Sequence, residues 1–172
     1  MWTFLLLFLR MKAPVHKKEK KRLDAVHRLG ILDTPSDPKY DALTQKAVEE
    51  LHIPISTVSI LDENREWYKS CQGLDMKEGP RDIAFCSWAL LAERVFIVED
   101  TLEDERFKNN PYVTGKPFIR FYAGFSLYDR ASHLPVGVFC VKDIKPRKLS
   151  VTELGVLFDL SKRAENLLNN AE

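Results

Sequence analysis

The three cysteines are the side chains of this sequence best suited to nucleophilic or redox chemistry. They are Cys71, Cys86 and Cys140, an odd number at wide spacings, without the CxxC pair of a structural zinc site. Cys86 opens a predicted short helix, and a helix N-terminus lowers the pKa of a thiol, which favours reactivity. Cys140 lies in an apolar predicted strand, where a free cysteine packs as a small apolar residue. We interpret all three as free structural thiols in a reducing cytoplasm.

The four histidines are the next candidates for metal binding. His16 and His27 lie on the first predicted helix, His52 lies at the end of the second, and His133 lies in a predicted turn. No two of them have the spacing that metal ligands show on a helix or a loop. We therefore predict no metal site.

An arginine and two aromatic residues could bind a small molecule. Arg120 and Tyr122 alternate onto the same face of a predicted strand, and Trp88 lies in the short helix. A guanidinium offers several N–H donors to a carboxylate or phosphate, and the aromatic rings would supply apolar walls with polar tips. In the alternative interpretation, Arg120 pairs with Asp100 or Asp104 and ties a long loop to the sheet. The sequence leaves both interpretations open.

A predicted β-hairpin forms the centre of the chain. Residues 119–128 alternate between apolar and mixed side chains, as expected for a strand with one buried face. Residues 136–141 are apolar on both faces, which favours a central strand that is covered on both sides. The polar residues 129–135 between them form a turn longer than two residues. We expect this hairpin to lie in the middle of an antiparallel sheet.

Shorter periodic segments flank the hairpin. Asp37 and a capping box from Ser150 to Glu153 mark the starts of two helices. Residues 99–116 form a long polar loop, and loops of this length are usually functional. Together the segments predict an α+β fold, a central antiparallel sheet with N- and C-terminal helices on one face and a loop and short-helix cover on the other. The predicted helices span residues 18–28, 38–51, 85–92 and 150–169, and the remaining strands span 55–61, 67–72 and 95–98.

Composition indicates one soluble domain without a strong charge bias. The chain has 172 residues and a formal net charge of +1, so no global field favours nucleic acid or an anionic membrane. The basic run at residues 16–22 is interpreted as a solvated helix face. The apolar run at residues 2–9 is shorter than the roughly 20 residues of a membrane span. It either packs on a helical interface or precedes a natural start at Met11, so we treat residues 1–17 as an extension and 18–172 as the domain.

The sequence resembles a GAF domain, of the type found in bacterial sensor histidine kinases and diguanylate cyclases. The matching segments run in family order from about residue 22 to the end of the chain. A dozen such segments in register indicate the fold strongly, but the fold hosts many ligands. They include Leu29-Gly-Ile-Leu-Asp-Thr-Pro35, Val58-Ser-Ile-Leu-Asp62, Trp67-Tyr-Lys-Ser70, Val98-Glu-Asp100, Asp104-Glu-Arg-Phe107, Asn110-Pro-Tyr-Val-Thr-Gly115 and Val141-Lys-Asp143.

The resemblance implies a small-molecule-sensing module with a pocket between the sheet and the cover at residues 85–116. It also implies a homodimer formed through the first and last helices. Similar domains often read Phe-Cys-Ala-His in the short helix, whereas this chain has Trp88 at the last of these positions, and tryptophan cannot ligate a metal or haem iron. The cofactor stays unknown. The ligand-binding residues expected from the resemblance are Phe85, Cys86, Trp88, Asp100, Phe107, Arg120 and Tyr122.

These observations predict a non-catalytic sensor in the cytoplasm, which binds a small molecule and signals through paired terminal helices to a separate effector protein. No nucleic-acid partner and no membrane span are expected. One alternative is a thiol-dependent reductase of small sulfoxides or peroxides, because some GAF proteins reduce methionine sulfoxide with cysteines. A second alternative is a structural dimerisation module whose pocket is occluded. The sequence does not identify the ligand.

Overall fold

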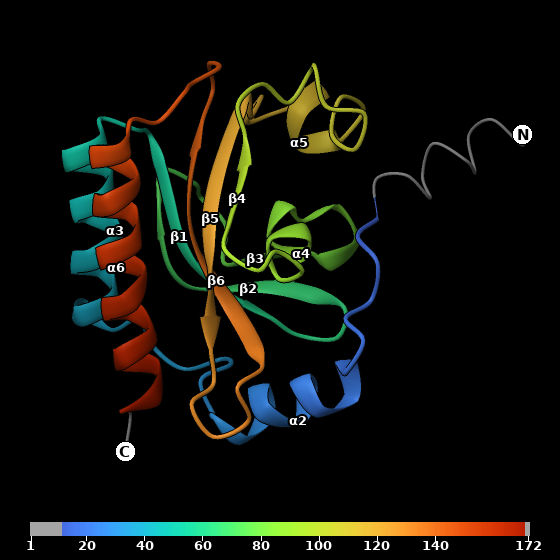
Figure 1. Ribbon diagram of the computed structural model, residues 1–172, viewed down its shortest axis with the longest axis vertical. Helices are drawn as coiled ribbons and strands as arrows, with labels where there is room; N and C mark the ends of the chain where they lie inside the picture. The colour runs from blue at the N-terminus through green and yellow to red at the C-terminus, as the bar shows by residue number, and fades with distance from the viewer. Residues whose placement is uncertain (1–11, 171–172) are drawn as a thin grey trace, which may run out of the picture.

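A six-stranded antiparallel sheet organises the computed structural model, which describes residues 12–170 (Figure 1). The strands follow the order β3-β2-β1-β6-β5-β4, so the predicted hairpin of β5 and β6 lies inside the sheet. The apolar run at residues 2–9 and the choice of start at Met11 lie outside the described residues. The strands are β1 (Ile55–Leu61), β2 (Arg65–Gln72), β3 (Glu78–Pro80), β4 (Val95–Val98), β5 (Phe121–Tyr128) and β6 (Pro135–Asp143).

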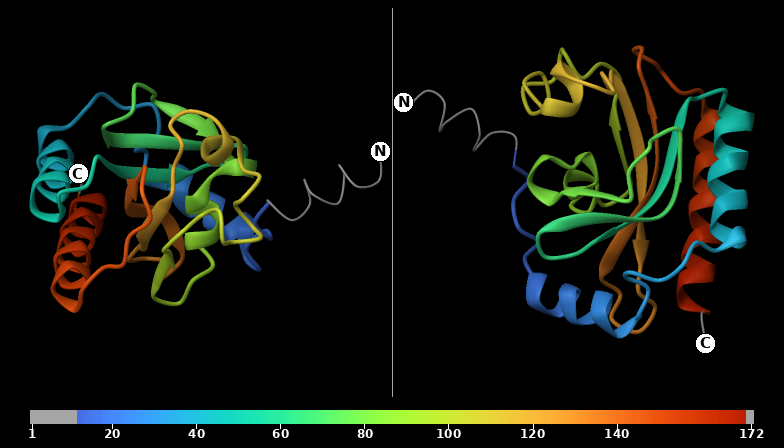
Figure 2. Two further views of the ribbon diagram at one scale, coloured as in Figure 1. Left: turned by 90° about the horizontal axis from the view of Figure 1, so that it is seen from above. Right: turned by 180° about the vertical axis from the view of Figure 1, so that it is seen from behind.

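Helices cover both faces of this sheet. The long helices α3 and α6 lie side by side on one face, and α4 and α5 lie with their loops on the other (Figures 1 and 2). The predicted α+β fold class is confirmed. In detail, α3 rather than α2 is the partner of α6, since α2 lies at the β5–β6 turn, where Arg28 pairs with Asp129 at 2.6 Å. The helices are α2 (Glu19–Arg28), α3 (Pro38–Leu51), α4 (Phe85–Ala89), α5 (Pro111–Thr114) and α6 (Val151–Asn169).

The predicted helix starts are confirmed by their caps. The Asp37 carboxylate accepts a hydrogen bond from the backbone N–H of Lys39, and Pro38 occupies the first position of α3. At the start of α6, the Ser150 side chain accepts from the backbone N–H of Glu153, whose carboxylate accepts from the backbone N–H of Ser150. Within residues 12–170, no helix is both long and apolar enough to cross a membrane.

The central hairpin differs from its predicted bounds at both strands. β5 begins at Phe121 rather than at residue 119, because the cover engages the preceding backbone: Ile119 N–H donates to Tyr112 and Thr101 N–H donates to the Arg120 carbonyl. β6 extends to Asp143, two residues beyond the predicted end, and all of its residues are buried. It pairs with β5 on one side and β1 on the other, which explains this burial.

The sheet separates two cores because successive residues of a strand point to opposite faces. On the helix side, Phe121 of β5 and Phe139 of β6 pack with Leu157 and Leu160 of α6. On the cover side, Tyr122 and Cys140 are among the side chains that pack beneath α4; the set also includes Val98, Phe107 and Val138. We refer to these as the helix-side core and the cover-side core.

The run at residues 16–22 is not a solvated face throughout. Arg22 is fully buried and donates two hydrogen bonds to Glu19, at 2.8 and 2.9 Å. Arg81, from the 3₁₀ turn before α4, donates to the same carboxylate at 2.6 Å. The prediction of a solvated face is wrong for Glu19 and Arg22, because they pair with each other and with the distant Arg81, and periodicity alone does not reveal such a partner.

Candidate ligand site between the sheet and its cover

Three of the residues expected to line a pocket form a continuous aromatic stack. The rings of Phe85 and Phe107 have their centroids 4.4 Å apart and lie 11° from parallel, and Phe85 stacks on Tyr122 at 5.3 Å. All three side chains are buried. The structure therefore brings these residues together, but as packed core rather than as the walls of an open pocket.

Trp88 lies at the edge of this stack, where a cation covers it. The Arg106 guanidinium lies 5.3 Å from the Trp88 ring centroid and 5.0 Å from that of Phe96, within range for cation–π attraction. Asp104 holds the guanidinium with hydrogen bonds of 2.6 and 2.9 Å. Arg106 thus fastens the loop before α5 onto the aromatic stack.

Arg120 and Asp100 form the ion pair that the alternative interpretation expected. Two nitrogens of Arg120 donate to Asp100 at distances of 2.8 to 3.1 Å. This pairing lowers the pKa of Asp100 and raises that of Arg120, in each case mainly through the shared hydrogen bonds. Both side chains are partly exposed, and Asp104 engages Arg106 instead. The pair ties the loop after β4 to the start of β5, and ligand binding by either residue stays a prediction.

A small polar cavity beside the aromatic stack is the feature that sequence reasoning missed. It has a volume of about 10 Å³, roughly the space of one water. Phe85 and Ile119 form part of its wall, and the polar side chains around it are Glu66, Tyr68, Tyr112 and Lys142. The available signal was a lysine directly after the apolar run at 136–141, but the predicted strand ended one residue too early to include it.

Glu66 and Lys142 are buried charges with few partners. They are 2% and 3% exposed. Glu66 accepts one long hydrogen bond, 3.4 Å from the Tyr68 hydroxyl to Oε2, and its Oε1 has no hydrogen-bond partner. Lys142 Nζ lies 5.5 Å from the centroid of the Tyr68 ring, and within the described residues it has no hydrogen bond or ion pair. Buried charges are normally paired or hydrogen-bonded, so Glu66 and Lys142 are unusual in having so few partners among the protein side chains.

The electrostatics of the cavity favour a charged lysine. Burial by itself disfavours the ammonium form of Lys142, but Cys140, Tyr68 and Glu66 around it outweigh that effect and raise its pKa. Burial raises the pKa of Tyr68 as well, so the phenol keeps its proton. The cavity therefore presents an N–H donor, a carboxylate acceptor and a phenol within one enclosed space.

The structure also brings together two cysteines that are far apart in sequence. Cys86 of α4 and Cys140 of β6 have their Sγ atoms 3.7 Å apart, and both are fully buried. Cys71 lies on β2, where its thiol contacts the carbonyl oxygen of Leu74. A single sequence gives no signal for this proximity, because it arises from packing the short helix against the central strand.

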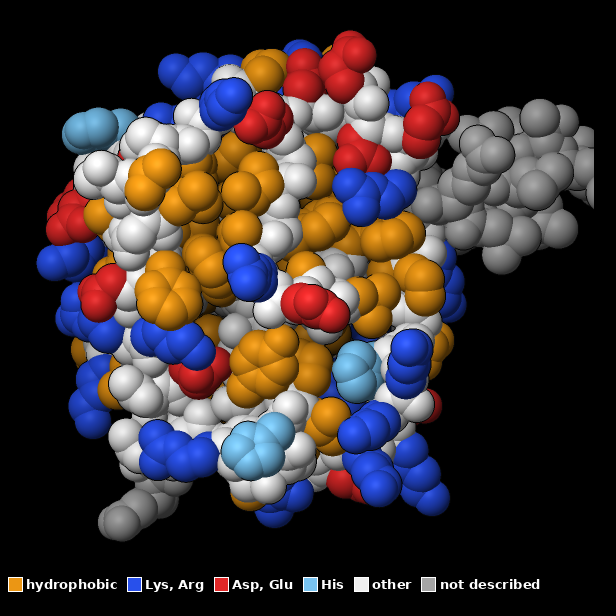
Figure 3. All heavy atoms as spheres, viewed as in Figure 1, with side chains coloured by type: hydrophobic (Ala, Val, Ile, Leu, Met, Phe, Trp, Pro, Cys, Tyr) orange, Lys and Arg blue, Asp and Glu red, His pale blue; other side chains and the backbone are white. Residues whose placement is uncertain are grey.

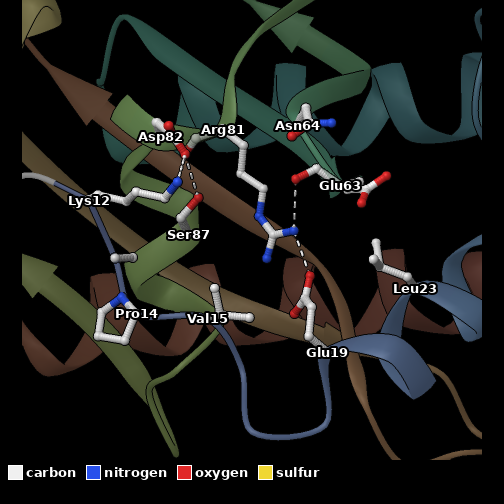
Figure 4. Close-up of a pocket in the computed structure, with 11 residues that line it drawn as sticks. Lys12, Pro14, Val15, Glu19, Leu23, Glu63, Asn64, Arg81, Asp82 and Ser87 are labelled. Carbon is white, nitrogen blue, oxygen red and sulfur yellow. Dashed lines mark hydrogen bonds and ion pairs between the residues drawn. The ribbon is translucent and has the colours of Figure 1, made fainter.

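A second hollow, of about 230 Å³, lies between the segment at residues 12–15 and the start of α4 (Figure 4). Arg81 occupies its centre, where Figure 4 shows its contacts with Glu19 at 2.6 Å and with the Glu63 carbonyl at 3.3 Å. It also donates to the Asp62 carbonyl at 2.9 Å. Lys12 pairs with Asp82 at its edge. The central cation of this hollow is therefore already paired with protein groups. Among residues 12–170, no group of three or more His, Cys, Asp or Glu could hold a metal ion.

Solved structures with a similar fold are GAF domains. The GAF domain of an Acinetobacter phosphoenolpyruvate-protein phosphotransferase aligns over 86% of this chain and 92% of its own, with 17% identity and a TM-score of 0.56. The GAF domain of Thermosynechococcus elongatus PixJ aligns over 91% and 90%, with 15% identity and a TM-score of 0.57. The chain has the GAF fold, and the resemblance read from the sequence is confirmed.

A solved enzyme shares this fold too. The type II free methionine-R-sulfoxide reductase from Thermoplasma acidophilum aligns over 74% of this chain and 88% of its own, with 14% identity and a TM-score of 0.60. At this identity the likeness concerns the fold and not the activity. No family model matches the sequence.

A curated relative changes the functional prediction. The chain is 40% identical over 134 residues to a Pseudomonas aeruginosa protein named cyclic di-GMP phosphodiesterase. The match covers 78% of this chain and 23% of the relative's length. Because this relative is named as an enzyme, the prediction of a protein without enzymatic activity is wrong. The residues that carry the resemblance to a GAF domain gave no signal of a link to an enzyme of this name.

Proposed function

We propose that this chain is a small-molecule-sensing module that regulates the hydrolysis of cyclic di-GMP. The GAF fold supports a sensing role in general, and the relative of 40% identity supports the link to cyclic di-GMP. The match covers 23% of that relative, so the module corresponds to a fraction of such a protein. The thiol-dependent reductase alternative has only the fold of the Thermoplasma enzyme in its favour.

The observation that carries the proposal is the sparse pairing of two buried charged residues, Glu66 and Lys142, in the wall of one small cavity. A ligand suited to both must offer an acceptor to the ammonium group and a donor to Glu66 Oε1, which describes a small polar molecule of the amino-acid or amide class. Phe85 and Ile119 would contact its apolar part. The present cavity of about 10 Å³ is too small for such a molecule, so binding requires the cover to move outward.

A chain of contacts at the end of β6 connects the cover to α6, so movement of the cover could change the position of α6. Lys142 is the penultimate residue of β6, and Asp143 after it pairs with Arg147, whose backbone N–H donates to Glu99 beyond β4. α6 begins four residues later and packs beside α3. The cover would then have two positions, inward and outward, and the position of α6 beside α3 would depend on them. A ligand that binds the outward position more tightly would shift the equilibrium toward it, by an amount set by the difference in affinity for the two positions.

The apolar surface between α6 and the β4 edge of the sheet is our proposed site of homodimerisation. Hydrophobic side chains gather in the view of Figure 3 over the β4 edge of the sheet, between α6 and the cover. Phe158 of α6 is 48% exposed and stacks edge-on against Phe125. Apolar surface of this kind marks interaction sites. Leu157 and Leu168 point into the helix-side core, so substitutions there would test folding rather than association.

The test replaces Lys142 with methionine in the chromosomal gene and measures cellular cyclic di-GMP by mass spectrometry. We expect the concentration of cyclic di-GMP to change, because the variant removes the ammonium group and keeps an apolar side chain of similar length. The matched control is Lys46→Met, which removes an exposed lysine that pairs only with Glu50 on α3. Equal cyclic di-GMP in the Lys142 variant, the control and the wild type would contradict the proposal.

A second measurement addresses the ligand directly. Native mass spectrometry of the purified wild-type protein, compared with its denatured mass, detects any retained small molecule. We expect a retained molecule in the wild type and in Lys46→Met, and none in Lys142→Met. A molecule retained equally by all three proteins would show that binding occurs elsewhere.

A further inference from the structure

Two thiols from opposite sides of the cover-side core are in contact. Cys86 lies in α4 and Cys140 lies at the middle of β6, and 3.7 Å separates their Sγ atoms. Neither side chain is exposed. The contact joins a short helix of the cover to the central strand of the sheet, which are 54 residues apart in the chain.

A missing side chain on the neighbouring strand makes this contact possible. Gly124 of β5 lies directly opposite Cys140. A β-carbon at Gly124 would lie 2.7 Å from the Tyr122 hydroxyl, closer than real β-carbons approach other atoms, and 3.0 Å from the Cys140 β-carbon, which is also a tight contact. Glycine at this position therefore leaves the space in which Tyr122 and the two thiols meet.

The surroundings give the two sulfur atoms different roles. The Tyr122 hydroxyl donates to Cys86 Sγ at 3.1 Å, and the Cys86 thiol is placed to donate to Cys140. Thr57 Oγ1 lies 3.1 Å from Cys140 Sγ, and the Lys142 ammonium is on the same face of β6. Burial raises the pKa of Cys86. For Cys140 burial acts in the same direction, but the hydrogen bond from Cys86 and the charge of Lys142 outweigh it and lower its pKa.

We propose that Cys86 and Cys140 are a redox modification site, which a small hydroperoxide converts reversibly into an intramolecular disulfide between α4 and β6. The Cys140 thiolate attacks the terminal oxygen of the hydroperoxide, breaks the O–O bond and becomes a sulfenic acid, while an alkoxide, or hydroxide in the case of hydrogen peroxide, leaves and takes up a proton. The Cys86 sulfur then attacks the Cys140 sulfur, and the sulfenic hydroxyl and the Cys86 proton leave as water. Two thiols are oxidised, one peroxide is reduced, and a small dithiol reverses the bond by exchange.

The geometry is compatible with this bond. A disulfide requires a sulfur–sulfur distance of about 2.05 Å, so the two Sγ atoms, now 3.7 Å apart, must move closer by less than about 2 Å. The small cavity borders residues close to both cysteines in the chain, since its wall includes Phe85, which precedes Cys86, and Lys142, which lies two residues after Cys140. Cys71 is on β2 and pairs with neither. The disulfide would hold α4 against the sheet. If the cover moves outward to bind a ligand, as in the proposed function, the disulfide would oppose that movement.

The experiment counts free thiols in the folded full-length chain. Purified protein is treated with hydrogen peroxide, denatured, alkylated with iodoacetamide and analysed by intact-mass and peptide mass spectrometry. We expect two of the three cysteines to become unavailable to alkylation, a cross-linked Cys86–Cys140 peptide, and full recovery of three thiols after dithiothreitol. Three free thiols after treatment, or a cross-link through Cys71, would overturn the inference.

Variants separate the roles of the two sulfurs. Cys86→Ala should stop at a Cys140 sulfenic acid that dimedone traps, whereas Cys140→Ala should give no trapped product at Cys86. Cys71→Ser is the matched control and should form the disulfide as fast as the wild type. Trapping at Cys86 in the Cys140 variant would reverse the assigned roles. The outcome is independent of cyclic di-GMP, so this inference and the proposed function can fail separately.

Discussion

The two faces of the sheet carry cores of different chemistry. The helix-side core is built mainly from aliphatic and aromatic side chains of the strands, α3 and α6. The cover-side core contains an aromatic stack together with two thiols and lies beside a buried lysine and glutamate. Apolar packing stabilises a single arrangement. Incompletely paired polar groups, in contrast, can gain hydrogen bonds or charge pairing when a ligand binds or a residue is modified. We therefore expect substitutions on the helix side to affect folding and substitutions on the cover side to affect function.

The largest effect should follow from removing a helix-side anchor. Leu157 is fully buried between α6 and the sheet, so Leu157→Ala leaves a cavity and should lower the free energy of unfolding by about 2–5 kcal/mol. Val151→Ala, at an 88% exposed position of the same helix, is the control. Urea denaturation followed by circular dichroism measures both variants. If the two substitutions cost the same, the division between a structural and a functional core would be lost.

A slightly smaller effect concerns Glu19, which links α2 to the cover. Burial opposes its charge, but hydrogen bonds from Arg22 and Arg81 outweigh this and lower the pKa of Glu19 to about 2. Because the folded pKa lies below the unfolded one, its contribution is complete above about pH 5 and disappears as the pH falls toward 2. We expect Glu19→Gln to cost on the order of 3 kcal/mol near neutral pH.

Urea denaturation of the wild type and Glu19→Gln at a series of pH values measures this contribution. The difference in stability between the two proteins should shrink steadily as the pH falls below about 5. A difference that stays constant down to the acid limit would mean that the ion pairs of Glu19 contribute little and that the substitution acts through packing alone.

The buried charges of the cover side should behave in the opposite way. Replacing both Glu66 and Lys142 with apolar residues, as in Glu66→Leu with Lys142→Met, removes two desolvated and poorly paired groups. Such replacements are often neutral or stabilising by about 1–4 kcal/mol. We expect a more stable protein in the absence of ligand, while each single variant should be less stable than the double variant. Thermal unfolding of the four proteins gives this double-mutant cycle, and a strongly destabilised double variant would mark the pair as structural.

The smallest effect should come from the Arg120–Asp100 pair. Both residues are partly exposed, and exposed ion pairs contribute little to stability. Arg120→Ala should lower the melting temperature slightly, and adding Asp100→Asn should recover part of the loss, since the unpaired carboxylate is removed. Melting curves of the single and double variants test this. A variant with unchanged melting but lost retention of the small molecule would instead support a ligand role for Arg120.

The sequence predicted the fold better than the site. Strands, caps and the central hairpin depend on local alternation and capping residues, such as Asp37 and Ser150, which a single chain displays directly. The cavity depends on Glu66 and Lys142, which come from β2 and β6 and meet only when the sheet is assembled. The contact between Cys86 and Cys140 has the same origin. Local patterns specify elements, whereas contacts between distant elements are set by topology.

The order of the sheet also has a consequence for how the chain folds. β1 and β2 form a local antiparallel pair, as do β5 and β6, and the two units join only through the pairing of β1 with β6. This joining closes a segment of about 80 residues, which costs more chain entropy than a hairpin turn. We expect it to be a late step, so that β1 presents an unpaired edge during synthesis until β6 has emerged. An apolar edge left open in this way favours aggregation, which makes β1 the segment most dependent on rapid completion of the chain.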